Sequence, residues 1–406
     1  MDLFDKFTAG AHDDPIVRLS RDIHGIAAFP KLTGAIGREM RYGGRPHVVW
    51  SLNNYLGLAN HPEVRAADAE FARRYGLGAP MGSRMMAGET DDLEHLEAEL
   101  ADYARKPAAI FFNFGYQGMF SLIDALVTRS DWIVYDAASH ACIIDGVRLH
   151  KGRGRTRAFP HNDVERLEAQ LAQVQRRRRA DEGLLVIAHG VYGMSGAQGR
   201  LRDIAGLKDR YQFRLLVDDA HGFGVLGPRG GGTGEAQDIQ HGIDLYFATF
   251  SKAGAGVGAF VATDERVAWR LRYTMRSQIF AKGLPWPVVA GNRVRLNLIR
   301  TRPQLRAKAW AVASALQDAL REAGLDIGAP ASLVTPVFLP MEPEAAVRYI
   351  ARIRADHGVF CSVVSYPVVP RGTVQLRLIS TAEHELADVP RTVHAITTAY
   401  RDLRAA

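Results

Sequence analysis

Short apolar runs alternate along the middle of the chain with segments whose apolar residues recur every three or four positions. Runs rich in Val, Ile, Leu and Phe are typical of strands buried on both faces of a parallel sheet, and the intervening pattern is typical of amphipathic helices. The alternation predicts an α/β fold with a mainly parallel sheet. The expected strands are residues 108–112, 132–135, 184–188, 215–217, 245–250 and 258–262.

Two of the intervening helices have clear start signals. Apolar residues fall on one stripe at positions 93, 96, 100 and 103, and again at positions 164, 167, 171 and 174. We expect Thr90 to cap the first helix and Asn162 or Asp163 to cap the second, because such side chains accept a hydrogen bond from a first-turn amide.

The pattern changes after about residue 290. A long helical stretch at 292–323 precedes strand-like pieces at 333–339, 359–364 and 374–379, with helical patterns at 343–357 and 382–401. A chain of 406 residues is usually too long for one core. We therefore predict an N-terminal arm (1–45), a large domain (46–290) and a small α+β domain (291–406).

Composition narrows the class of protein. The chain is 47% hydrophobic and 23% charged, as in ordinary globular proteins. It contains no apolar run long enough to span a membrane, and its acidic first residues do not resemble a signal peptide. Cys142 and Cys361 stand far apart without metal-ligand partners. We expect a cytoplasmic protein with buried thiols and no metal site.

The net charge of +7 is partly explained by the run from Arg176 to Arg179. No aromatic residues are interleaved with these arginines, as a surface that stacks bases would need. We interpret the run as a solvated helix end and expect no nucleic-acid partner. A positive surface also attracts polyanionic substrates, among them acyl-coenzyme A (acyl-CoA).

Chemistry-bearing residues follow two of the expected strands. Lys252 comes two residues after the run 245–250, where loss of solvation favours the neutral amine that condenses with an aldehyde. Asp218, Asp219 and His221 follow residues 215–217. Since sites in open α/β sheets lie at the carboxyl ends of strands, Asp218 is placed to pair with a pyridinium nitrogen. A metal site is the alternative, and the lack of other clustered ligands argues against it.

Two more turns add to this site. The turn at 112–118 follows a strand and opens a helix, where the free amides of Gly115 and Tyr116 suit a phosphate. The Thr249 hydroxyl is placed to join them. His140 stands just past residues 132–135, where it can lie on an aromatic ring. Each signal is weak by itself, because glycine turns and capping histidines are common.

Together these motifs resemble, in order and spacing, the α-oxoamine synthases, which are fold-type I enzymes dependent on pyridoxal 5′-phosphate (PLP). The similarity runs from residues 51–58 to 376–384 and includes 161–163 and 366–370. The family includes serine palmitoyltransferase, 8-amino-7-oxononanoate synthase, glycine C-acetyltransferase and 5-aminolevulinate synthase. The resemblance implies a homodimer with shared active sites. It also implies decarboxylative condensation of glycine, alanine or serine with an acyl-CoA to an aminoketone, CoA and CO2.

The resemblance also implies a role for each matching residue. Lys252 would carry PLP as a Schiff base and move the α-proton of the substrate. The guanidinium of Arg377 would bind the substrate carboxylate, whose shape its planar fork matches. The other implied roles are ring-nitrogen pairing for Asp218, ring-oxygen contact for His221, ring stacking for His140, phosphate binding for Gly115, Tyr116 and Thr249, and carboxylate binding for Asn53.

The chain departs from the family pattern at several positions. His189 stands where members usually carry an acidic residue, Gly193 where they carry serine, and Leu93 where many carry histidine. Ala281-Lys282-Gly283 replaces the Ser or Thr that members offer to the phosphate of the partner subunit. We expect Lys282 to serve PLP or CoA across the dimer, and the alternative is an exposed loop lysine without a ligand.

Two other functions remain open at this point. An aminotransferase or PLP lyase would use the same Lys252 and Asp218 without an acyl donor. A catalytically weakened homologue would act as a binding subunit, although the retained Lys252 argues against this.

Overall fold

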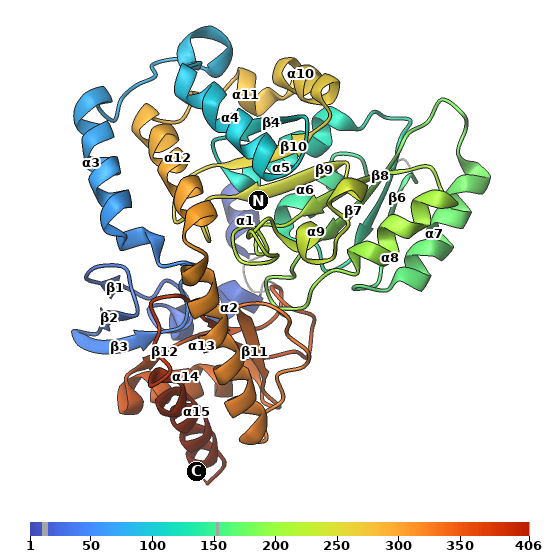
Figure 1. Ribbon diagram of the computed structural model, residues 1–406. Helices are drawn as coiled ribbons and strands as arrows, with labels where there is room; N and C mark the ends of the chain where they lie inside the picture. The colour runs from blue at the N-terminus through green and yellow to red at the C-terminus, as the bar shows by residue number, and fades with distance from the viewer. Residues whose placement is uncertain (10–14, 152–153, 406) are drawn as a thin grey trace. The chain divides into compact units, whose positions relative to one another are not determined.

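The computed structural model describes residues 1–9, 15–151 and 154–405. It divides into two units (Figure 1), each with its own buried hydrophobic cluster. The large unit comprises residues 53–193 and 197–307, and the small unit comprises residues 1–52, 194–196 and 308–406.

The large unit contains a seven-stranded sheet in the order β4-β10-β9-β8-β7-β5-β6. β5 to β9 pair in parallel, and β10 runs antiparallel to both β4 and β9. This confirms the predicted mainly parallel α/β fold. The strands are β4 (Ala108–Phe112), β5 (Trp132–Asp136), β6 (Thr156–Phe159), β7 (Leu184–His189), β8 (Arg214–Asp218), β9 (Leu245–Thr249) and β10 (Ala259–Thr263).

Helices with apolar faces cover this sheet. Met119 and Leu122 of α5 and Ile143 and Val147 of α6 lie in one buried cluster with residues of the strands. The helices of the large unit are α3 (Pro62–Tyr75), α4 (Asp91–Tyr103), α5 (Gly115–Leu126), α6 (Ala141–Arg148), α7 (Val164–Arg177), α8 (Leu201–Gly206), α9 (Thr233–Ala236), α10 (Glu265–Thr274), α11 (Arg276–Ile279) and α12 (Trp286–Thr301).

The predicted caps are present. The Thr90 hydroxyl accepts a hydrogen bond from the Leu93 amide at 3.2 Å. Asp163, the second of the two expected residues, caps α7 by accepting from the Arg166 amide at 2.8 Å. α7 ends at Arg177, so the arginine run lies at a helix end as expected.

The small unit contains two further sheets. One has the order β1-β2-β3-β12, and the other is antiparallel with the order β11-β14-β13. Its strands are β1 (Leu32–Thr33), β2 (Glu39–Tyr42), β3 (Arg45–Val49), β11 (Val334–Phe338), β12 (Val359–Phe360), β13 (Ser362–Val364) and β14 (Gln375–Ile379). Its helices are α1 (Leu3–Ala9), α2 (Pro15–Ile23), most of α13 (Pro303–Glu322), α14 (Pro343–His357) and α15 (Asp388–Ala405).

The boundaries differ from those expected for an arm, a large domain and a small domain. β3 pairs in parallel with β12, which ties residues 45–49 to the C-terminal half of the chain. The predicted arm therefore belongs to the small unit. The sequence did not indicate this, because strand pairing across some three hundred residues leaves no local pattern. The predicted helix at 292–323 is two helices, since Pro303 has no amide hydrogen and disfavours the helical conformation at Arg302.

In the described part of the chain, no helix is long and apolar enough to cross a bilayer. Cys142 and Cys361 are both buried free thiols, as the sequence predicted.

Candidate active site

Three neighbouring parallel strands of the large unit end at the same edge of its sheet. His189 is the last residue of β7 and lies in register with Asp218, the last residue of β8. Asp218 in turn lies in register with Phe247 of β9, two residues before Thr249. The structure therefore brings together side chains that are far apart in the sequence, at the edge where ligands of open α/β sheets bind.

The two adjacent aspartates have different surroundings. The buried side chain of Asp218 accepts a hydrogen bond from the Ala220 amide at 3.1 Å. The fully buried Asp219 instead accepts from the Thr233 amide and hydroxyl, both at 2.7 Å, and from the Tyr246 hydroxyl at 3.1 Å. Burial raises the pKa of Asp219 to about 7 against these donors. Asp219 is thus committed to the fold, and Asp218 is the carboxylate at the site.

Asp218 and Lys252 are both close enough to His140 to interact with it. Loss of solvation lowers the pKa of His140; the Asp218 carboxylate opposes this shift and the Lys252 ammonium adds to it. His140 caps α6, and its Nδ1 accepts a hydrogen bond from the Cys142 amide at 3.3 Å. Lys252 is half-buried in the turn after β9, between the buried residues Phe250 and Ala253.

The turn before α5 has the features of an anion site. Gly115 is the first helical residue, and the N-cap Phe114 offers no side-chain cap, so first-turn amides are not capped by a side chain. A Cβ built on Gly115 would lie 3.5 Å from the Thr249 hydroxyl oxygen, which places these two residues side by side. The Tyr116 hydroxyl donates a hydrogen bond to the Asp145 carboxylate. Gly115 and its neighbour Tyr116 therefore lie beside Thr249, and their role in binding a phosphate remains a prediction.

His221 is held by a residue that received no role from the sequence. The Tyr55 hydroxyl and His221 Nδ1 form a hydrogen bond of 2.6 Å. A Cβ at Gly193 would lie 2.3 Å from His221 Nε2, so the imidazole occupies the space that any side chain at this position would need. Tyr55 lies in the stretch 51–58 that carried the resemblance, which was the available signal for it.

The remaining predicted residues are Asn53, Arg377 and Lys282, which lie in different segments of the chain. Asn53 is a half-buried residue at the start of the large unit, whereas Arg377 is half-buried in β14 of the small unit. Lys282 is exposed, and its ammonium donates to the Gly78 carbonyl at 2.7 Å. Its own carbonyl accepts from Asn113 Nδ2 at 2.6 Å, which puts this segment beside the turn that leads into α5. The roles of Asn53, Arg377 and Lys282 remain predictions.

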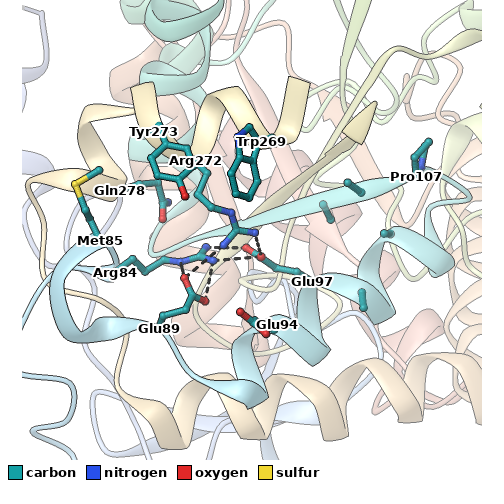
Figure 2. A pocket seen from close by; sticks show the side chains of 14 residues that line it. Arg84, Met85, Glu89, Glu94, Glu97, Pro107, Trp269, Arg272, Tyr273 and Gln278 are labelled. Carbon is teal, nitrogen blue, oxygen red and sulfur yellow. Dashed lines mark hydrogen bonds and ion pairs between the residues drawn. The ribbon is translucent and has the colours of Figure 1, made fainter. Parts of the chain in front are cut away.

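A separate cavity of about 640 Å³ lies in the large unit, with Trp269 among its lining residues (Figure 2). Arg84 pairs there with Glu89 at 2.9 Å and with Glu97 at 2.6 Å, and Arg272 also pairs with Glu97 at 2.7 Å. Because these charges neutralise one another, the network holds the segment around Arg84 against α4 rather than presenting a charge to a ligand.

The strand-end residues fit PLP. Asp218 offers a carboxylate for the ring nitrogen, Lys252 an amine for the aldehyde, and the turn at Gly115 uncapped amides for the phosphate. Among the described residues, no group of three or more His, Cys, Asp or Glu is arranged to hold a metal ion.

Comparison with known proteins identifies the family. The family model for aminotransferase class I and II matches residues 45–396. The chain is 49% identical over 397 residues to cysteate-C-fatty acyltransferase of Capnocytophaga ochracea, covering 98% of this chain and 94% of that protein. It is 36% identical over 369 residues to 8-amino-7-oxononanoate synthase of Anaeromyxobacter dehalogenans, covering 91% and 90%.

A solved structure agrees with these relatives. Serine palmitoyltransferase from S. paucimobilis, with a bound PLP–myriocin aldimine, superposes with a TM-score of 0.90 at 29% identity and full coverage of both chains. All three relatives are acyltransferases, which sets aside the alternative of an aminotransferase or lyase without an acyl donor. The chain belongs to the aminotransferase class I and II family and, within it, to the α-oxoamine synthases, PLP-dependent enzymes that condense an amino acid with an acyl thioester and release CO2.

Proposed function

We propose that the amino acid is cysteate, the three-carbon analogue of serine that carries a sulfonate, and that the acyl donor is a long-chain fatty acyl thioester. The product would be a 2-amino-3-oxoalkane sulfonate. The observation that carries this proposal is the 49% identity to a cysteate-C-fatty acyltransferase over 98% of the chain, against 36% to an 8-amino-7-oxononanoate synthase. Serine, which has the same carbon skeleton, is the alternative substrate.

The charge of the chain supports an anionic substrate pair. A sulfonate and an acyl-CoA both carry negative charge, and the net charge of +7 attracts them. The exposed Lys282 stands beside the turn that opens α5. We expect it to act across a cytoplasmic homodimer, on the phosphate of PLP or on CoA bound to the partner subunit.

PLP supplies an electron sink for the negative charge that develops at the α-carbon of the amino acid. With PLP bound, the Lys252 amine would remove the α-proton and return a proton to the same carbon after loss of CO2. The Asp218 carboxylate would keep the ring nitrogen protonated, and the His140 imidazole would contact the ring. The positions of the three side chains, at or shortly after the ends of β5, β8 and β9, support these roles.

The other proposed roles concern binding. Amides of Gly115 and Tyr116 and the Thr249 hydroxyl hold the phosphate, which the uncapped start of α5 supports. His221, oriented by Tyr55, contacts the ring oxygen. By the resemblance to the family, Asn53 and Arg377 would each bind the substrate carboxylate.

A substrate matrix tests the proposal. Cysteate, serine, alanine and glycine are each paired with short and long acyl-CoAs, and thiol release and CO2 release are both measured. We expect kcat/KM for cysteate with a long acyl chain to exceed that for serine at least about a hundredfold, because a site built for a polar group discriminates against an analogue without it. Equal turnover of serine would overturn the cysteate assignment alone. Absence of thiol release with every amino acid would contradict the reaction itself.

A further inference from the structure

His189 lies between two residues of the proposed site and has no role in the function described so far. It ends β7, and only 5% of its surface is exposed. Its Nε2 is 3.1 Å from the His140 backbone nitrogen, and its Nδ1 is 3.8 Å from Oδ2 of Asp218. One buried imidazole therefore contacts both the histidine that faces the ring and the carboxylate that faces the ring nitrogen.

The hydrogen bond to His140 determines where the proton of this imidazole lies. A backbone amide only donates, so Nε2 must be the acceptor and cannot carry a proton. The ring is therefore neutral, with its proton on Nδ1, the atom that faces Asp218. Burial, which lowers the pKa of His189, favours the same neutral state.

A chain of buried contacts keeps the imidazole in place. The Tyr192 ring packs against it at a centroid distance of 5.1 Å, and the Tyr192 hydroxyl donates to Asp136 at 2.6 Å. The fully buried Asp136 also accepts from the amides of Ala138 and Asn162, each at 2.7 Å. Since these groups come from β5 and the loops after β5, β6 and β7, the orientation of His189 is fixed by the body of the large unit.

We propose that His189 is a positioning residue for the cofactor ring. Its Nε2 fixes the backbone of His140, and its Nδ1–H orients the carboxylate of Asp218. This inference rests on the proposed roles of His140 and Asp218. The contact with Asp218 is longer than a hydrogen bond, so it acts through the attraction between an N–H dipole and a carboxylate. A neutral ring supplies both contacts without placing a second negative charge beside Asp218.

Two substitutions, each of which introduces a side-chain amide, test the two contacts of His189 separately. The amide of His189→Gln reaches the position of Nε2 and keeps an acceptor for His140, but leaves no donor beside Asp218. The amide of His189→Asn stands at the position of Nδ1 and keeps that donor, but leaves the His140 amide unpaired. Tyr192→Phe is the matched control, because it removes a buried hydrogen bond from the same loop and keeps the ring that packs on His189.

Two measurements on the holoenzyme report the two contacts, and neither needs an acyl donor. The first is the PLP dissociation constant, obtained from the visible absorbance on dilution. The second is the rate at which cysteate, and separately alanine, exchanges its α-proton in deuterated water. We expect His189→Gln to slow exchange by roughly threefold to tenfold and to leave PLP affinity within about threefold. We expect His189→Asn to weaken PLP binding roughly tenfold, as for one buried hydrogen bond lost.

The proposal is supported if His189→Gln slows exchange and spares PLP affinity while His189→Asn weakens PLP binding. If neither variant moves either measurement, or if both move them only as Tyr192→Phe does, the proposal is overturned. Failure of both variants to fold, by thermal unfolding, would assign His189 a structural role and overturn it as well. Asp218→Asn tests the assumed role of Asp218 independently. An unchanged exchange rate in that variant would remove this role whatever the His189 variants show.

Discussion

Asp218→Asn tests the proposed electron-withdrawing role with almost no change of shape. The Asp218 carboxylate accepts a hydrogen bond from the Ala220 amide at 3.1 Å, and an amide oxygen retains that contact. The other oxygen of the carboxylate is then replaced by an NH2 group. Because this group only donates, it cannot hold a proton on the ring nitrogen.

The size of the effect follows from the contact that is lost. A hydrogen bond to a charged group contributes about 1.5–3 kcal/mol. Since each 1.36 kcal/mol changes a rate tenfold, this contact alone predicts exchange that is slower by about tenfold to a hundredfold. An unprotonated ring also withdraws fewer electrons from the α-carbon, so we expect the total loss to be at least about a hundredfold.

The assay follows the α-proton of the bound amino acid by NMR in deuterated water without an acyl donor. The visible absorbance of the variant should show that PLP is still bound. The reasoning is refuted if Asp218→Asn exchanges the proton at the rate of the unaltered enzyme while it binds PLP.

Asp219→Asn is the matched control from the neighbouring position. Its carboxylate is fully buried against Thr233 and Tyr246. The Thr233 hydroxyl both donates and accepts, so an amide is accommodated there. We expect an exchange rate within about threefold of the unaltered enzyme, as for other mild substitutions. An equal loss in both variants would show that the effect of Asp218→Asn reflects disturbed packing and not lost charge.

Lys252→Ala should abolish both the visible absorbance of the lysine-bound cofactor and turnover, and retained turnover with added PLP would contradict its role. Arg377→Ala should raise the KM for the amino acid by about tenfold to a hundredfold and spare PLP binding, since it loses a bidentate charged contact; loss of both ligands would mark Arg377 as structural. Lys282→Ala should weaken PLP binding if the ammonium serves PLP, or raise the acyl-CoA KM if it serves CoA, and no change in either constant would leave an exposed lysine without a ligand. Burial lowers the pKa of His384 to about 4. The free energy of unfolding should therefore decrease by roughly 3 kcal/mol as pH falls from about 6.5 to about 4. Acid unfolding of His384→Gln should lack this dependence, and a variant with the pH profile of the unaltered enzyme would contradict the prediction.

The strands that carry the site could be predicted from the sequence because their signal is local. Residues 108–112 and 184–188 are unbroken apolar runs. In the structure, the side chains on both faces of these strands are almost all buried. Once the sheet is parallel, the carboxyl ends of its strands lie at one edge, so residues that follow the strands are expected at that edge. The order β7-β8-β9 in the sheet then makes His189, Asp218 and Thr249 neighbours.

Other features had no local signal. β6 (Thr156–Phe159) is an edge strand with partly exposed residues and lacks an apolar run. The pairing of β3 with β12 joins distant segments, so the arm could not be assigned to the small unit. The contact between Tyr55 and His221 joins residues 166 positions apart, and Gly193 lies beside the same imidazole; sequence spacing reports neither.

Two departures from the family pattern lie at the end of β7 and in the loop after it, and the one at His189 changes the charge of the site. Where the resembled family usually carries an acidic residue and a serine, this chain has His189 and Gly193. His189 accepts the hydrogen bond of the His140 amide, and Tyr55 holds His221 beside Gly193. What changes is that a neutral imidazole stands where a carboxylate would bring a negative charge. At an effective dielectric constant of about 20, one unit charge about 8 Å away changes the free energy of binding an anion by about 2 kcal/mol. A site with one negative charge fewer suits an amino acid with one more, and this is the difference between serine and cysteate.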